Sequence, residues 1–214
     1  MELHKGRTAM TDEEFKKYCS DEDTLKWKQE SVEHLVRDEW IDFRRVKYRF
    51  PDGSKYEPFY NYSRRSYVVI VASDTEGNYL CVRQYRHGIG EVTTEFPAGG
   101  INLDGTEGYV TKSEKDSRRA ETPLEAAKRE LQEETGCVSD EWRHLITIPS
   151  NATISDNYAY IYEARNCRTA SSQKLDETEF LNVRKLSAED IEDLIRRNAF
   201  QQAVHVMAWL LSRR

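Results

Sequence analysis

The sequence lacks the features that mark membrane-spanning, secreted and nucleic-acid-binding proteins. No apolar run in the 214 residues approaches the roughly 18 residues of a membrane span, and the N-terminal stretch has no apolar signal core. The net charge of −6 opposes extended binding of nucleic acid, because an acidic surface repels a phosphate backbone. We therefore expect a cytoplasmic protein that binds a small molecule and contacts neither membrane nor extended nucleic acid.

Cysteine is scarce, and its copies are far apart in the sequence. The four cysteines are Cys19, Cys81, Cys137 and Cys167. No two of them have the spacing of zinc ligands. We expect free thiols in a reducing compartment.

Hydrophobic patterning predicts strands with interspersed helices. Strand-like segments are expected near 67–72, 79–84, 91–96, 145–148, 158–162 and 180–183, and helices near 11–20, 122–135, 187–197 and 199–212. Regular alternation of strand and helix is missing, which favours an α+β or sandwich-like α/β/α domain. In the last helix we expect one apolar face formed by Phe200, Ala203, Val204, Met207, Leu210 and Leu211.

The domain organisation that we expect has three parts. Residues 1–30 form an N-terminal helical extension, and 31–62 form strands broken by the turn signal Pro51-Asp52-Gly53. Residues 63–214 carry the functional domain. Within it, the polar stretch before residue 121 reads as a long loop.

The clearest helix, 122–135, carries a cluster of carboxylates. Thr122 and Glu125 have capping-box spacing, and Gly136 ends the helix. Glu130 and Glu134 lie four residues apart, so their side chains are neighbours on one face.

Glu133 lies three residues after Glu130 and joins the same face. Such crowding of like charges near the end of a helix is unfavourable, and a divalent cation would offset it. The alternative is a solvated acidic face. Arg129 and Gly136 beside the cluster favour the metal site.

These residues carry a family resemblance. The stretch Arg129–Cys137 (RELQEETGC) resembles the second half of the Nudix box, and Glu121 occupies its preceding acidic position. The glycine of the first half is best matched by Gly99, which is separated from Glu121 by 21 residues, 16 more than the five that the pattern allows. We infer an insertion at about 105–120.

Other stretches resemble the ADP-ribose and nucleotide-sugar pyrophosphatase branch of the Nudix family. They are Val82–Arg86 (VRQYR), Glu95–Gly99 (EFPAG), Asp176–Phe180 (DETEF) and Val36–Gly53, the last resembling N-terminal strands that help to build a dimer. The resemblance implies a Nudix-type α/β/α sandwich with a mixed sheet and an N-terminal strand and helix extension. It also implies a homodimer.

The resemblance implies roles for matched residues. Metal ligands are expected at Glu130, Glu133, Glu134 and the backbone carbonyl of Ala98, holding Mg²⁺ with Mn²⁺ as a possible substitute. The catalytic set is Glu179 as base, Glu177 as its alternative, Glu133, and Arg129, which orients the glutamates. For Glu177 and Glu179 the competing interpretation is a solvated turn.

Three further residues are expected on the substrate side. Arg86 would pair with a phosphate, Glu95 would support the site next to it, and Trp40 would stack on a nucleobase. The competing interpretations are a surface salt bridge for Arg86, a strand-end carboxylate for Glu95 and ordinary packing for Trp40.

The resemblance implies Mg²⁺-dependent hydrolysis of a nucleoside diphosphate linked to a sugar. ADP-ribose, giving AMP and ribose 5-phosphate, is the first expectation, and GDP-mannose or another nucleotide sugar is the alternative. A Nudix-like ligand sensor without catalysis is the alternative from another class. The complete set of box glutamates favours the enzyme.

Overall fold

The computed structural model describes residues 9–102 and 121–214, so the insertion expected at about 105–120 lies outside the described residues. Contacts divide the chain into two compact units. One comprises Met1–Leu35 and Phe43–Asn61, and the other comprises Val36–Asp42 and Tyr62–Arg214.

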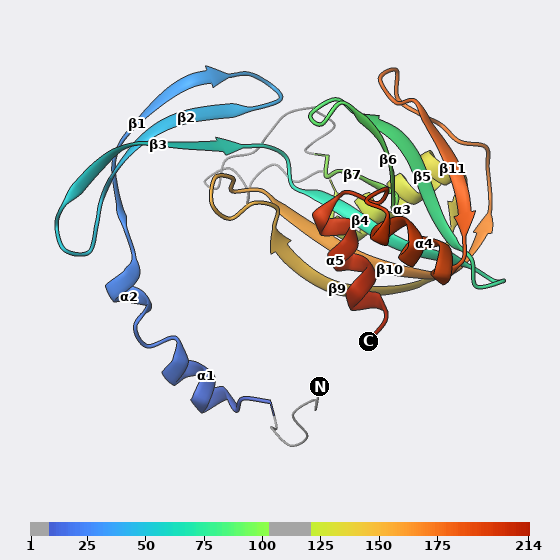
Figure 1. The fold of residues 1–214 in the computed structure, drawn as a ribbon, viewed down its shortest axis with the longest axis horizontal. Coiled ribbons are helices and arrows are strands. Elements are labelled where there is room, and N and C mark those ends of the chain that lie inside the picture. The colour runs from blue at the N-terminus through green and yellow to red at the C-terminus, as the bar shows by residue number, and fades with distance from the viewer. Residues whose placement is uncertain (1–8, 103–120) are drawn as a thin grey trace. The chain divides into compact units, whose positions relative to one another are not determined.

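The N-terminal unit contains two short helices and most of a three-stranded sheet (Figure 1). Its elements are α1 (Asp12–Tyr18), α2 (Glu22–Leu25), β1 (Lys28–Arg37), β2 (Asp42–Arg49) and β3 (Lys55–Ser63), and the sheet order is β1-β2-β3. Strand β1 begins at Lys28, earlier than the expected start at Ser31.

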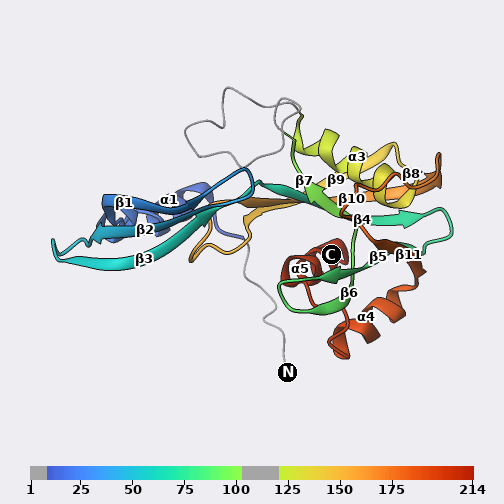
Figure 2. The ribbon, with the colours of Figure 1, turned by 90° about the horizontal axis from the view of Figure 1, so that it is seen from above.

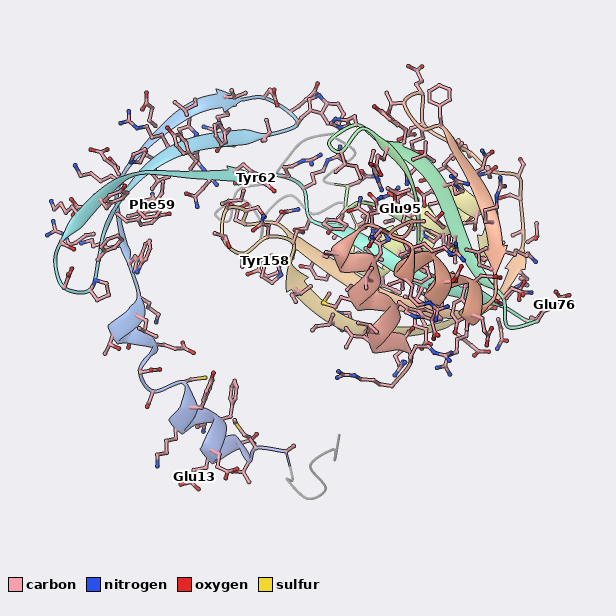
Figure 3. The ribbon with its side chains drawn as sticks, in the orientation of Figure 1. Glu13, Phe59, Tyr62, Glu76, Glu95 and Tyr158 are labelled. Carbon is pink, nitrogen blue, oxygen red and sulfur yellow. The ribbon has the colours of Figure 1, made fainter. Side chains whose placement is uncertain are left out.

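An aromatic cluster explains the early start of β1. The ring of Trp27, just before the strand, lies 4.5 Å from the ring of Phe50 and 5.3 Å from that of Phe59, measured between centroids. Figure 3 labels Phe59 on β3. These contacts fix the chain next to β2 and β3, so pairing can start at the following residue. Trp27 nevertheless remains 51% exposed, and the described residues bury none of α1 or α2.

The second unit is built on an eight-stranded mixed sheet. Its strands are β4 (Tyr67–Asp74), β5 (Tyr79–Arg86), β6 (Glu91–Glu95), β7 (Ala98–Gly100), β8 (Cys137–Val138), β9 (Glu141–Pro149), β10 (Tyr158–Thr169) and β11 (Leu181–Leu186). The order is β11-β5-β4-β10-β8, with β6 on β5, β7 on β4 and β9 on β10. Strands β4 and β10 pair in parallel, whereas β5 pairs antiparallel with β4, β6 and β11.

Helices cover both faces of this sheet. Helix α3 (Pro123–Thr135) lies on one side, and α4 (Ala188–Arg196) and α5 (Ala203–Ser212) lie on the other (Figure 2). Alternate residues of β4 enter different cores: Val68 and Ile70 pack on the α3 side, and Val69 and Val71 pack on the α4–α5 side. The predicted α/β/α sandwich with a mixed sheet is confirmed.

The apolar face predicted for the last helix is confirmed only in part. Phe200 is buried, and Val204 and Met207 pack against the same core, but Leu210 is 60% exposed. Helix α5 begins only at Ala203, and its buried residues are His205, Ala208 and Trp209. The prediction differs because it started the helix at residue 199, whereas residues 199–202 are not helical, and because it counted no histidine as a core residue.

The helix signals around α3 are confirmed. Thr122 and Glu125 form the capping box, and Gly136 ends the helix in the left-handed conformation with φ of 71°. A side chain at Gly136 would lie 2.3 Å from the carbonyl oxygen of Ser171, so glycine is required there for space as well as for conformation.

All four cysteines are free thiols, as expected, and three of them are buried. Among the described helices, none combines the length and apolarity that crossing a bilayer requires.

A buried histidine of α5 contacts the last residue of β6 and the residue that follows it. The backbone N–H of Phe96 donates to Nδ1 of His205 at 3.1 Å, and Nε2 of His205 lies 3.8 Å from the carboxylate of Glu95. Burial lowers the pKa of His205 to about 4; the charge of Glu95 opposes this shift and that of Arg86 adds to it. His205 is therefore neutral in the folded protein at neutral pH.

This histidine predicts a loss of stability in acid. Below its ordinary pKa of about 6.5 the unfolded chain binds a proton at residue 205 that the folded chain does not bind until about pH 4. The free energy of unfolding should therefore fall by about 2 kcal/mol from this residue between pH 7 and pH 5. His205→Asn keeps an acceptor for the N–H of Phe96 and should remove that part of the pH dependence. Urea unfolding at both pH values is the measurement, and an equal decline in both proteins would refute the assignment.

Candidate active site

Helix α3 places three glutamates at different depths. Glu130 and Glu134 are 7% and 2% exposed, whereas the side chain of Glu133 is 34% exposed. The four-residue spacing puts the two buried carboxylates on the same face, toward β7. The sequence-predicted cluster thus contains two desolvated carboxylates and one that faces solvent.

The guanidinium of Arg129 connects this cluster to the preceding loop. Its Nη1 donates to Glu130 at 2.7 Å and to Glu133 at 2.9 Å. Its Nη2 and Nε donate to the two carboxylate oxygens of Glu121 at 2.7 and 3.1 Å. Nη2 also donates to the backbone carbonyl of Gly100 at 2.8 Å. Burial works against the charge of Arg129, but these carboxylates outweigh it and raise its pKa.

Glu134 carries the least compensated charge of the cluster. One of its oxygens accepts the backbone N–H of Ala98 at 3.0 Å. No cation within the described parts of the chain forms an ion pair with it, and its pKa is raised by burial first and by Glu130 second. Burial also raises the pKa of Glu130, to about 7, despite the nearby Arg129.

Strand β7 approaches α3 so closely at Gly99 that a Cβ at this residue would displace the carboxylate of Glu130. An added Cβ on Gly99 would lie 2.0 Å from the carboxyl carbon of Glu130. At the next residue, Gly100, an added Cβ would meet nothing nearer than Arg65 at 3.5 Å. Gly99, the box glycine expected from the sequence, is therefore where the strand touches the carboxylate cluster.

Arg86 and Glu95 form a bidentate pair between β5 and β6. Nε and Nη2 of Arg86 donate to the two oxygens of Glu95 at 2.9 and 2.6 Å, and the hydroxyl of Thr93 donates to the same carboxylate at 2.6 Å. Burial opposes the charge of Glu95, yet Arg86 and the neighbouring groups hold its pKa below the usual value. The side chain of Arg86 stays 35% exposed, and its charge acts on the pKa of Glu134.

The segment before β11 is tied to the end of α3. The backbone N–H of Lys174 donates to the backbone carbonyl of Glu133 at 2.9 Å. The side-chain amide of Gln173 donates to the backbone carbonyl of Glu134 at 2.6 Å. Further along this segment Glu179 is half-buried, and its charge raises the pKa of both buried glutamates. Glu177 is exposed.

Trp40 is not brought to this cluster. It lies in the connection between β1 and β2 and is 56% exposed. Its backbone N–H donates to Asp38 at 2.8 Å, and its ring stacks on no other ring of the described chain.

The carboxylate cluster fits a hard divalent cation chemically. Within residues 9–102 and 121–214, no three acidic, histidine or cysteine side chains converge into a complete metal cage. Mg²⁺ does not need one, because it usually keeps waters and takes substrate phosphates together with one or two carboxylates. Two buried carboxylates with raised pKa values supply oxygen donors and a charge that a cation would neutralise.

Sequence reasoning missed two residues of the site. Thr93 stands two residues before Glu95 on the same strand, so alternation could have placed their side chains together. His205 lies 109 residues after Phe96 in the sequence, and no local sequence pattern indicates that the two residues are in contact.

The tight approach at Gly99 predicts a sharp contrast between neighbouring glycines. Gly99→Ala should lower the free energy of unfolding by about 1–3 kcal/mol, because it forces Glu130 away from Arg129. Gly100→Ala is the matched control and should stay within about 0.5 kcal/mol. Adding Glu130→Ala should relieve most of the cost of Gly99→Ala in urea unfolding. Equal effects of the two glycine changes would contradict this geometry.

Comparison with known proteins assigns the chain to a family. Residues 63–210, more than half of the chain, match the model of the NUDIX domain. The fold is shared with a crystal structure of an ADP compounds hydrolase at a TM-score of 0.70 and 22% identity, covering 88% of this chain and 92% of that one.

Three curated relatives are similar over part of their length. An ADP-ribose pyrophosphatase of Mycobacterium tuberculosis is 34% identical over 47% of this chain and 42% of its own. An ADP-ribose pyrophosphatase of Bacillus subtilis is 27% identical over 60% and 61%, and a methanol dehydrogenase activator of Bacillus methanolicus is 27% identical over 66% and 68%. For both pyrophosphatases, the chain spans less than two thirds of their length. Together with the box residues gathered around Arg129, the domain match shows that the chain belongs to the Nudix family.

Proposed function

We propose that the chain hydrolyses the pyrophosphate bond of a nucleoside diphosphate linked to a sugar, with ADP-ribose as the first substrate and AMP and ribose 5-phosphate as products. The observation that carries the proposal is the convergence of the box glutamates, Arg129 and the loop of β7 at one place. The two relatives named ADP-ribose pyrophosphatases support the choice of substrate.

Mg²⁺, or Mn²⁺ in its place, would be held by the carboxylates of Glu130, Glu133 and Glu134 and by the carbonyl of Ala98. When bound, the metal supplies positive charge to the phosphate oxygens and lowers the pKa of a coordinated water. Arg129 acts as a positioning residue, because it orients Glu130 and Glu133 and ties them to Gly100.

Glu179 is the proposed general base. It is half-buried, and its charge raises the pKa of Glu130 and Glu134, which supports a role beside these carboxylates as acceptor of a proton from the attacking water. The alternative, Glu177, is exposed on the same segment. Glu179 would take the proton of the attacking water and later release it to solvent.

Arg86 is the proposed phosphate-binding residue. Glu95 occupies its Nε and Nη2, which leaves Nη1 for an oxygen of the pyrophosphate. The role proposed for Glu95 is to position Arg86, because Arg86 and Thr93 already donate to its oxygens. For Trp40, which is not brought to the cluster of its own chain, the proposed role is stacking on the base of the substrate across the dimer interface, and its 56% exposure is compatible with that role.

The protein is proposed to act as a homodimer in the cytoplasm. Exposed aromatic side chains of the N-terminal unit, such as Trp27 and Tyr56 at 51% and 56%, are of the kind that interfaces bury. The free thiols suit a reducing compartment. Light scattering should give twice the chain mass of 25.1 kDa, and a monomeric mass would refute the dimer.

Two other functions compete with this one. GDP-mannose or another nucleotide sugar could replace ADP-ribose at the same carboxylates. A regulatory role is suggested by the name of one relative, the methanol dehydrogenase activator, and the alternative from another class is a Nudix-like ligand sensor without turnover. Turnover of a substrate panel separates the three.

The test of the proposal is release of products from ADP-ribose, GDP-mannose, nucleoside triphosphates and dinucleotides, with Mg²⁺ and with chelator. We expect metal-dependent cleavage of ADP-ribose into AMP and ribose 5-phosphate. Fastest turnover of another nucleotide sugar would change the substrate, and silence across the panel in folded protein would favour the regulatory role.

Variants in the same assay test the residue roles. Glu134→Gln and Glu133→Gln should each lower kcat by at least about 100-fold, since the metal contributes several kcal/mol. Glu179→Gln should lower kcat by about 10²–10⁴-fold, and Glu177→Gln, the matched change two residues away, by only a few-fold. The reverse order for the last two would make Glu177 the base.

A further inference from the structure

A hollow of about 330 Å³ lies on the β6–β5–β11 part of the sheet, apart from the carboxylate cluster. It is lined by Arg83, Gln84, Tyr85, Val92, Phe180, Asn182 and Arg184. Its volume is within the roughly 300–1,000 Å³ of small-molecule sites. None of these residues belongs to the metal cluster described above.

Strand register explains how the hollow is built. Arg83 and Tyr85 are two residues apart on β5, so they leave the same face of the sheet, whereas Arg86 leaves the other face. Arg83 pairs with Asn182 of β11, and Tyr85 pairs with Val92 of β6.

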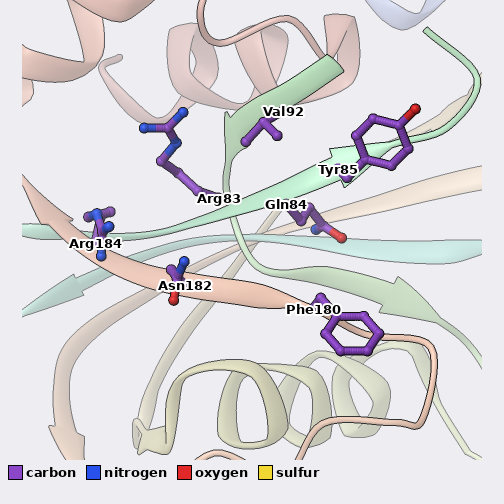
Figure 4. Close-up of a pocket in the computed structure, with 7 residues that line it drawn as sticks. All are labelled: Arg83, Gln84, Tyr85, Val92, Phe180, Asn182 and Arg184. Carbon is purple, nitrogen blue, oxygen red and sulfur yellow. The ribbon is translucent and has the colours of Figure 1, made fainter. Parts of the chain in front are cut away.

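Continuing the β11 register places residue 180 across from Tyr85. A row of three apolar side chains, from Val92 through Tyr85 to Phe180, therefore lies beside a row of polar ones. Figure 4 shows Arg83, Asn182 and Arg184 toward one end of the hollow and the rings of Tyr85 and Phe180 toward the other.

The rings in this hollow are unusually exposed for a sheet surface. Phe180 is 83% exposed, Tyr85 60% and Val92 54%. Three such side chains in one row leave apolar area in water that a planar ligand would cover. Asn182, which pairs with Arg83, offers an amide donor and acceptor on the same face.

The two arginines lack the partners that other arginines of this chain have. Among the described residues, no carboxylate forms an ion pair with Arg83 or Arg184, whereas Arg49 and Arg143, for example, each have one. Nη1 of Arg184 donates only to the carbonyl of its neighbour Val183, at 3.0 Å. In a chain of net charge −6, two unpaired guanidinium groups on adjacent strands mark a place for an anion.

We propose that this hollow is a second binding site, for a nucleoside monophosphate. The base stacks on Phe180 and Tyr85, and the phosphate reaches Arg83 and Arg184, which can grip it with paired donors. A sugar phosphate would leave the rings bare, and a free nucleoside would leave the arginines unpaired. The site does not rest on the proposed hydrolysis, although its occupant would hold Phe180, the residue that follows Glu179.

The test is isothermal titration of the full chain with AMP, carried out in the Glu134→Gln background with chelator so that the metal cluster is disabled. We expect saturable binding of AMP, with adenosine and ribose 5-phosphate each about tenfold weaker or more, because each keeps only half of the contacts. No saturation with AMP, or equal affinity for ribose 5-phosphate, would overturn the proposal.

Variants locate the binding. Phe180→Ala, and separately the double change Arg83→Gln with Arg184→Gln, should each weaken AMP by about tenfold or more. Two matched controls should leave it unchanged: Arg168→Gln, an exposed arginine elsewhere on the unit, and Tyr18→Ala, an aromatic residue that is 70% exposed. Thermal melts check that all variants are folded. AMP binding that the pocket variants and the controls leave equally intact would place the ligand elsewhere and overturn the assignment.

Discussion

The guanidinium of Arg129 holds together two parts of the chain that stand on either side of residues 103–120. Glu121 and two glutamates of α3, Glu130 and Glu133, come from one side, and the carbonyl of Gly100 comes from the other. Without this cation, the carboxylates would repel one another, and β7 would keep only the hydrogen bond from Ala98 to Glu134 as its polar contact with the helix. Arg129 also donates to carboxylate oxygens that a metal would use as ligands, so metal binding and the Arg129 contacts compete for the same oxygens.

The buried carboxylates of the site determine both its chemistry and its effect on the stability of the fold. Glu134 is 2% exposed and carries no ion pair among the described residues, whereas Glu95 at 0% is satisfied by Arg86 and Thr93. Two carboxylates at similar depth therefore have pKa values shifted in opposite directions. The one with the lowered pKa stabilises the fold, and the one with the raised pKa is left ready for a cation.

Local signals predicted well what local physics decides. The cap at Thr122, the end at Gly136 and the shared face of Glu130 and Glu134 depend only on residues within one or two turns, and the structure has all of them. The contacts that the sequence did not predict join distant parts of the chain. His205 of α5, for example, lies 3.8 Å from the carboxylate of Glu95 at the end of β6. The apolar face of α5 was predicted only in part, because the helix starts later than expected and buries His205, whose partners come from β6 and the residue after it.

The parallel pairing of β4 with β10 has a consequence for how the protein is made. Tyr67 pairs with Ala159, so the centre of the sheet is completed only after β10, which ends at Thr169, has left the ribosome. At a synthesis rate of about 5–20 residues per second, β4, apolar on both faces, waits several seconds for this partner. During that time α3 and its glutamates have no finished sheet to pack on. The interval leaves the parallel edge of an apolar strand open to pairing with other chains until β10 arrives.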